Sequence, residues 1–246
     1  MKFIIGKKLD MTQVWRGEKV IGVTRVQAGP CPVVQVKTDS QDGYSAVQLG
    51  FGRRKEKNIK KPQAGHLKKA ELFSKDGKTN LRYLGEFRDE VKELKIGDVV
   101  DVSTFAVGDV VKVTGTAKGK GFQGGVRRHG WHGHNTSHGT KDQVRTSGSI
   151  GAGGIQHVLK GMRMPGRMGG NRVTTANLKI VQVDKDNNIL YVSGAVPGAR
   201  NGLVLIYGQG ELKVAAPSAS SGQAKAGTEV ATEPVTEEKK EAVKNN

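Results

Sequence analysis

The glycine-rich segment 119–124 is the part of the sequence that most resembles a nucleotide-binding loop. It matches the pattern G-x-G-x-x-G, follows an expected strand and precedes Asp142, which lies near the distance of a ribose-binding acid. A dinucleotide site needs a helix directly after the loop, and residues 125–140 contain too many glycines and histidines for one. The kinase and phosphate-loop patterns are also incomplete. We therefore predict no cofactor and expect these glycines to let backbone amides approach phosphate groups closely.

A histidine cluster, His129, His132, His134 and His138, is the second group that could do chemistry. Structural zinc sites usually include cysteine, and catalytic sites hold their ligands on regular elements; this cluster has neither. We predict no bound metal. Imidazole groups that stack on bases or donate to phosphates suit this context, and Trp131 would add a stacking surface. A small local apolar cluster is the alternative interpretation of Trp131.

No set of catalytic side chains emerges from the remaining sequence. Cys31 is the only cysteine, is flanked by prolines and has no nearby histidine, so we expect a small buried apolar residue. Asp98, Asp101 and Asp109 lie at expected strand ends, where carboxylates commonly stabilise turns. We predict that the chain is not an enzyme.

The lysines and arginines fall into two groups. A dense block at 53–61 suits neutralisation of phosphates, although a solvated charged surface would give the same pattern. The second group is spaced singly between glycines, as expected for a narrow segment in which each cation meets a different phosphate. The residues predicted to bind RNA are Arg53, Arg54, Lys55, Lys57, Lys60, Lys61, Lys118, Lys120, Phe122, Arg127, Arg128, His129, Trp131, His132, His138, Arg145, Lys160, Arg163, Arg167 and Arg172.

The overall charge agrees with a polyanionic partner. The chain of 246 residues has 40 Lys and Arg against 23 Asp and Glu, a formal net charge of +17. A compact domain with this excess repels itself unless the charge faces a polyanion. No apolar run is long enough to span a bilayer, no basic amphipathic helix is evident, and the N-terminus does not resemble a signal peptide. These features favour a cytoplasmic RNA-binding protein.

The elements that must position these residues are predicted to be mainly β-strands. Glycine- and aspartate-rich turns separate them, including a hairpin turn at 186–188, and one short helix is expected at 65–70. Many short strands with such turns predict a small antiparallel β-barrel or β-sandwich, and one barrel is the simplest account. The expected strands are 20–26, 33–37, 46–49, 81–87, 99–102, 110–113, 178–183, 189–192 and 203–207.

A long extension is predicted to interrupt this barrel. Residues 112–175 contain eleven Lys or Arg, one acid, sixteen glycines and five of the six histidines. Such a segment cannot bury enough apolar area to offset the entropy of ordering, so it should be disordered when free. We predict a barrel domain from residues 1–113, with a basic loop at 52–70, and residues 176–214. An irregular glycine-rich basic extension, the arm, occupies 114–175, and a disordered C-terminal tail occupies 215–246.

Several segments resemble motifs of the large-subunit ribosomal protein L-three family, bacterial type. The longest are GTAKGKGFQG at 115–124 and GMRMPGRMG at 161–169. Similarity covers roughly residues 1–214. The chain departs from the family pattern at Asp10, where glycine is usual, and at Val144 and Ser147, which replace a histidine and a proline. The other matching segments are 5–8, 11–12, 35–38, 42–44, 46–50, 61–66, 137–139, 148–151 and 194–198.

The resemblance implies a β-barrel on the subunit surface and an arm that reaches toward the peptidyl-transferase centre. It also implies binding to 23S rRNA near its 3′ end, an early role in subunit assembly, contacts with neighbouring large-subunit proteins, and no catalysis by the protein. Two other hypotheses remain at this point. The chain could be a nucleotide-dependent enzyme that uses the glycines at 119–124, or an RNA chaperone or RNA-modification accessory outside the ribosome.

Overall fold

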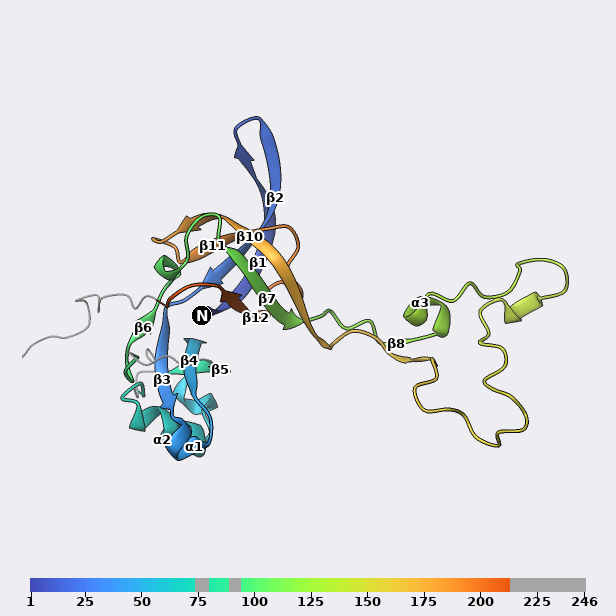
Figure 1. Cartoon of the computed structure of the whole chain (residues 1–246), viewed down its shortest axis with the longest axis horizontal. Helices are drawn as coiled ribbons and strands as arrows, with labels where there is room; N and C mark the ends of the chain where they lie inside the picture. The colour runs from blue at the N-terminus through green and yellow to red at the C-terminus, as the bar shows by residue number, and fades with distance from the viewer. Residues whose placement is uncertain (74–79, 89–93, 213–246) are drawn as a thin grey trace, which may run out of the picture.

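A computed structural model describes residues 1–73, 80–88 and 94–212 of the chain (Figure 1). This part is mainly β, which confirms the predicted fold class at that level. The tail predicted at 215–246 lies outside the described residues. Within them, no helix is both long and apolar enough to cross a bilayer.

Six antiparallel strands form a closed barrel in the order β1, β12, β7, β10, β11, β2. Closure places the first strand beside the last, with Ile4 opposite Ile206. The two strands that flank the arm, β7 and β10, are also neighbours, with Val113 opposite Thr175. The arm therefore leaves and re-enters the barrel at adjacent positions. The strands are β1 (Lys2–Arg16), β2 (Lys19–Ala28), β7 (Val110–Thr116), β10 (Arg172–Asp184), β11 (Ile189–Ser193) and β12 (Leu203–Gly208).

A second antiparallel sheet, in the order β5, β4, β3, β6, packs beside the barrel. Its strands are β3 (Cys31–Lys37), β4 (Ala46–Arg53), β5 (Leu81–Phe87) and β6 (Val99–Val100). Short helical elements connect them: α1 (Asp39–Asp42), η1 (Glu56–Asn58), α2 (Lys61–Lys69) and η2 (Val102–Thr104). Barrel and sheet share one core, so they form a single packed body.

The basic loop predicted at 52–70 is shorter than expected. Arg53 still belongs to β4, and the helix predicted at 65–70 is α2, which begins earlier, at Lys61. Proline is favourable in the first turn of a helix, and Pro62 lies there. Leu67, fully buried against Val34 and Leu81, anchors this helix to the sheet.

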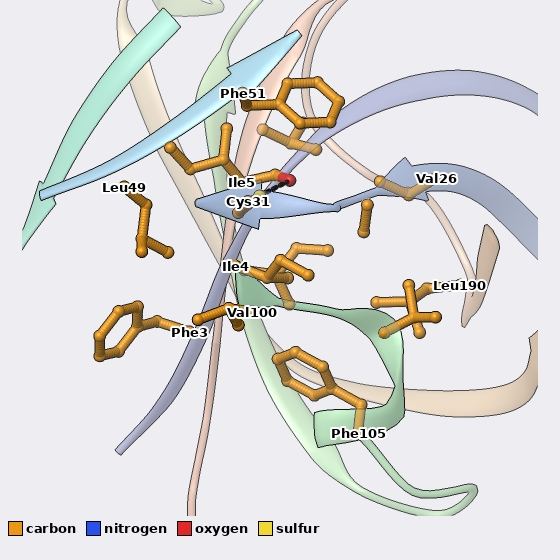
Figure 2. Packing of buried hydrophobic residues seen from close by; sticks show 14 of the residues in the cluster. Phe3, Ile4, Ile5, Val26, Cys31, Leu49, Phe51, Val100, Phe105 and Leu190 are labelled. Atoms are coloured by element: carbon orange, nitrogen blue, oxygen red, sulfur yellow. Dashed lines mark hydrogen bonds between the residues drawn. The ribbon is translucent and has the colours of Figure 1, made fainter. Parts of the chain in front are cut away.

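The shared core explains why the two sheets stay together (Figure 2). Phe3 of β1 stacks on Phe87 of β5 with ring centroids 4.5 Å apart. Cys31 is fully buried, as predicted, and its thiol donates to the carbonyl oxygen of Ile5 at 3.3 Å. Burial raises the pKa of the Cys31 thiol to about 12, so the group stays neutral at physiological pH.

Two strand ends differ from the sequence expectation. The strand predicted at 99–102 stops at Val100, because the Asp101 carboxylate accepts the Val102 N–H at 2.7 Å and begins η2. No strand was predicted before residue 20, yet β1 spans Lys2–Arg16. Its outer half pairs only with β2, up to Arg16 opposite Lys19, and this hairpin projects beyond the barrel (Figure 1).

Asp10, which stands where the family usually has glycine, pairs with Arg25. A register shift interrupts the pairing of β1 with β2 between Lys8 and Met11, so Asp10 lies at a bulge. Its two carboxylate oxygens accept Nε and Nη2 of Arg25 at 2.7 and 2.6 Å. A bidentate pair of this kind fixes orientation as well as charge, so it braces the hairpin where it leaves the barrel.

Candidate nucleic-acid interface

The arm begins as a hydrogen-bonded ribbon, which we call the stalk (residues 117–123 and 166–171). The Ala117 N–H donates to the Asn171 carbonyl oxygen, and the Lys120 N–H donates to that of Met168, both at 2.9 Å. The ladder continues into β8 (Phe122–Gln123) and β9 (Gly166–Arg167). The stalk thus prolongs β7 and β10 and directs the arm away from the barrel (Figure 1).

Close backbone packing in the stalk depends on Gly169. Its φ is +73°, a left-handed conformation that favours glycine, and a Cβ at this position would collide with the carbonyl oxygen of Lys118. The two strands of the stalk can therefore approach each other only because residue 169 has no side chain.

The arm head (residues 124–165) contains a helix where none was expected. Helix α3 (Gly125–His129) follows the glycine pattern directly, which corrects the prediction for 125–140. It spans only five residues and ends at Gly130, whose φ of +72° closes the turn. One turn of helix offers much less of an axial dipole than the long helix of a dinucleotide fold. The head also contains η3 (Lys141–Gln143).

Trp131 packs inside the arm head. Its ring covers Gly125 so closely that a Cβ there would overlap the indole, and it stacks on His129 with ring centroids 5.8 Å apart. His129 Nε2 lies 3.0 Å from the Met164 carbonyl oxygen, and Arg128 Nη1 donates to the same atom at 2.6 Å. The local cluster that was the alternative for Trp131 is therefore present, and it joins the two sides of the head.

The predicted RNA-binding residues are mostly exposed. Of the twenty, only Arg54, His129 and Trp131 are half-buried; Phe122 is 76% exposed. The structure does not bring them to one place, since the block at 53–61 lies beside the second sheet and the others follow the arm. No group of three His, Cys, Asp or Glu side chains within the described ranges is arranged to hold a metal ion.

The charges of the arm lack counter-ions. The resolved carboxylate ion pairs join Lys2 to Asp109, Arg25 to Asp10 and Lys37 to Glu86, all on the barrel or the second sheet. No cation of the arm forms an ion pair with another residue that the structure describes. The cations of the arm are therefore not neutralised by carboxylates within the described residues.

A further pair of cations lies where the arm meets the barrel. Lys8 Nζ donates to the carbonyl oxygens of Val196 and Gly198 at 2.6 and 3.2 Å. Burial, and then the charge of Lys118, lowers the pKa of Lys8. The proximity of these two lysines could not be predicted from the sequence, because they come from β1 and from the stalk.

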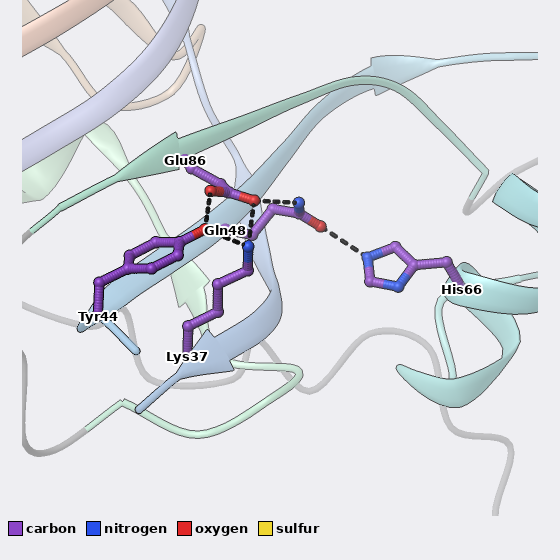
Figure 3. Close-up of polar contacts among 5 residues, drawn as sticks. All are labelled: Lys37, Tyr44, Gln48, His66 and Glu86. Carbon is purple, nitrogen blue, oxygen red and sulfur yellow. Dashed lines mark hydrogen bonds and ion pairs between the residues drawn. The ribbon is translucent and has the colours of Figure 1, made fainter. Parts of the chain in front are cut away.

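A polar network holds the basic helix α2 against the sheet (Figure 3). Lys37 Nζ pairs with Glu86 at 2.9 Å and donates to the Tyr44 hydroxyl. Gln48 donates to Glu86 at 3.2 Å, and its carbonyl oxygen lies 2.6 Å from His66 Nε2 on α2. The hydrogen bond from Lys37 is the main cause of the lowered pKa of Glu86. The network therefore fixes α2 to the second sheet at His66.

The arm head also exposes apolar side chains that the sequence analysis did not single out. Ile150, Ile155, Leu159 and Met162 are each between 41% and 56% exposed. The sequence did not predict this exposed apolar set, because glycines lie among its members and neither a helical nor a strand period connects them.

Known proteins resemble the chain over most of its length. The family model described as "Ribosomal protein L3" matches residues 86–189. The "Large ribosomal subunit protein uL3" of Desulfitobacterium hafniense (strain Y51) is 49% identical over 207 residues, which cover 83% of this chain and 94% of that protein. The same-named protein of Pelotomaculum thermopropionicum is 48% identical, over 83% of this chain and 95% of its own. At this identity and coverage, the chain belongs to the ribosomal protein L3 family.

Proposed function

We propose that the chain is a structural constituent of the large ribosomal subunit that acts by binding RNA and not by catalysis. Relatives that match most of its length are named as proteins of that subunit. The observation that carries the proposal is the arm, whose exposed cations have no ion-pairing partner among the described residues. Ribosomal RNA would supply the missing negative charge as phosphates.

The finer proposal keeps the organisation expected from the sequence. We assign residues 1–113 and 176–214 to the barrel domain on the subunit surface, and residues 114–175 to the arm, whose first and last residues still belong to β7 and β10. The arm penetrates the rRNA toward the peptidyl-transferase region. The target is 23S rRNA near its 3′ end, where the protein supports early assembly beside neighbouring large-subunit proteins. The stalk supports this proposal because a hydrogen-bonded ribbon gives the arm a direction before it meets RNA.

The residues of the arm would have two different roles, RNA binding and support of the arm head. Exposed cations such as Lys120, Arg145 and Arg163 would neutralise phosphates, and Phe122 would stack on a base. His129 and Trp131 would instead maintain the shape of the head. The exposed apolar residues of the head would be covered in the particle.

Co-sedimentation of the tagged full-length chain tests the assignment. We expect it to travel with the large subunit in equimolar amount and to remain there after a moderate salt wash. Migration as free protein, or with other RNA in the absence of large subunits, would contradict the proposal and favour an RNA chaperone.

A charge-matched pair of variants tests the role of the arm. Each lost phosphate contact should lower the slope of log affinity against log salt by about 0.9. Four arm substitutions should therefore lower it by up to about 3.6, and four barrel substitutions by much less. The arm set is Lys120→Gln, Arg145→Gln, Lys160→Gln and Arg163→Gln; the barrel set is Lys19→Gln, Lys112→Gln, Lys179→Gln and Lys185→Gln. Equal slopes for both sets would show that the arm has no special part in RNA binding.

A further inference from the structure

A cleft of about 800 Å³ lies between the barrel and the second sheet. Three cations line it from separate parts of the chain: Lys7 of β1, Arg53 at the end of β4, and Arg82 of β5. Only Arg53 among them was predicted from the sequence to bind RNA. Lys7, Arg53 and Arg82 belong to three different strands, β1, β4 and β5, so only the fold brings the three together.

The cleft has the electrostatic character of an anion site. No acidic side chain lines it, and none of its three cations forms an ion pair with a residue in the described ranges. Cations that converge without a carboxylate repel one another, and a bound anion would remove that repulsion. A phosphate is the group that guanidinium and ammonium side chains jointly bind best.

The same cleft has a flat apolar surface beside the cations. The Arg82 guanidinium lies over the Tyr83 ring, with its central carbon 4.9 Å from the ring centroid. Tyr83 is half-buried, and buried Phe51 and half-buried Pro32 also line the cleft. Unpaired RNA bases stack on aromatic rings and on guanidinium planes of this kind. The volume is in the range of a single small ligand, not of an RNA helix.

We propose that this cleft holds one unpaired nucleotide of the bound RNA, with its phosphate at Lys7, Arg53 and Arg82 and its base on the Arg82–Tyr83 pair. The inference rests on the proposed RNA-binding function and adds a site away from the arm. The cleft would give the barrel domain a binding site of its own, so that the arm and the barrel bind the RNA at separate places.

Crosslinking tests the site without altering the protein. The full-length chain is bound to a 4-thiouridine-substituted transcript of the 3′ region of 23S rRNA, irradiated, and digested for mass spectrometry. We expect RNA adducts on the peptide that contains Arg82 and Tyr83, in addition to adducts on the arm. Adducts on the arm with none on this peptide would overturn the cleft proposal alone, whereas no RNA binding at all would overturn the proposed function with it. In assembled subunits, a protein crosslink at Tyr83 in place of RNA would also overturn the cleft proposal.

Paired variants give a quantitative readout. The double variant Lys7→Gln, Arg82→Gln should lower the salt slope by about 1.4, since each contact to a single strand contributes about 0.7. The control, Lys179→Gln with Lys185→Gln, removes the same charge from exposed barrel positions and should lower the slope less. Identical slopes for the two variants, with thermal unfolding unchanged in both, would refute the site.

Discussion

Gly169→Ala should open the stalk of the arm without disturbing the barrel. Residue 169 has a φ of +73°, and an alanine there would place Cβ against the carbonyl oxygen of Lys118. The left-handed conformation alone costs a residue with a side chain about 1–2 kcal/mol. The collision adds to this cost, because its partner is backbone and cannot rotate away.

The expected effect is measurable by amide hydrogen exchange of the free full-length protein. A change of about 1–2 kcal/mol corresponds to a factor of about 5–30 in an opening equilibrium. The amides of Lys120, Met168 and Gly170, which donate across the stalk, should therefore exchange at least about 5-fold faster. Amides in the ladder between β7 and β10 should keep their protection.

Gly161→Ala is the matched control. Gly161 has a similar φ of +83°, but no atom lies within 4 Å of its Cβ position. This variant should leave exchange in the stalk unchanged, because it introduces strain in the head without a collision across the ribbon. If Gly169→Ala and Gly161→Ala gave the same stalk exchange as the wild type, the close approach at Lys118 would not hold the stalk together.

Three further outcomes are expected. Leu49→Ala, in the fully buried core, should lower the free energy of urea unfolding by about 2–5 kcal/mol, whereas Leu159→Ala, 56% exposed, should change it by less than about 0.5 kcal/mol; similar losses would contradict the assigned core. The Cys31 thiol, buried and with its pKa raised to about 12, should react with a thiol reagent only in denaturant, and stoichiometric labelling of native protein would refute its burial. Because the hydrogen bond from Lys37 lowers the pKa of Glu86, the carboxylate stabilises the fold above the ordinary glutamate range and loses that effect as the pH falls through the lowered pKa. Glu86→Gln should therefore be less stable than wild type at neutral pH, with a gap that closes in acid; a gap independent of pH in unfolding titrations would exclude this linkage.

The sequence was most informative where structure depends on near neighbours. The strand predicted at 81–87 is β5 with its observed bounds, and the turn at 186–188 correctly joined β10 to β11. There the Asp184 carboxylate accepts the backbone and side-chain N–H groups of Asn187. A period of two residues and a turn formed within a few residues are local properties, so they can be recognised without knowledge of the fold.

The arm contains structural features that local sequence patterns cannot predict. Its composition suggested a segment without a large core that is disordered when free, and the hydrogen-bonded stalk at 117–123 and 166–171 was not foreseen. The stalk was missed because its ladder is made of backbone groups, which are the same in every sequence. The sequence did not decide between a stacking surface and a local apolar cluster for Trp131, for a related reason. A glycine that makes room for a ring cannot be distinguished by sequence alone from one that makes a turn.

The residues alone are enough to predict that the chain is basic and mainly β, and that it carries a glycine-rich segment with many lysines and arginines. The pairing of Ile4 with Ile206, which closes the barrel, and the cleft lined by Lys7, Arg53 and Arg82 follow only from the fold. Charge and strand period belong to residues and their immediate neighbours. Which distant strands become adjacent depends instead on how the whole set of apolar faces can be buried at once.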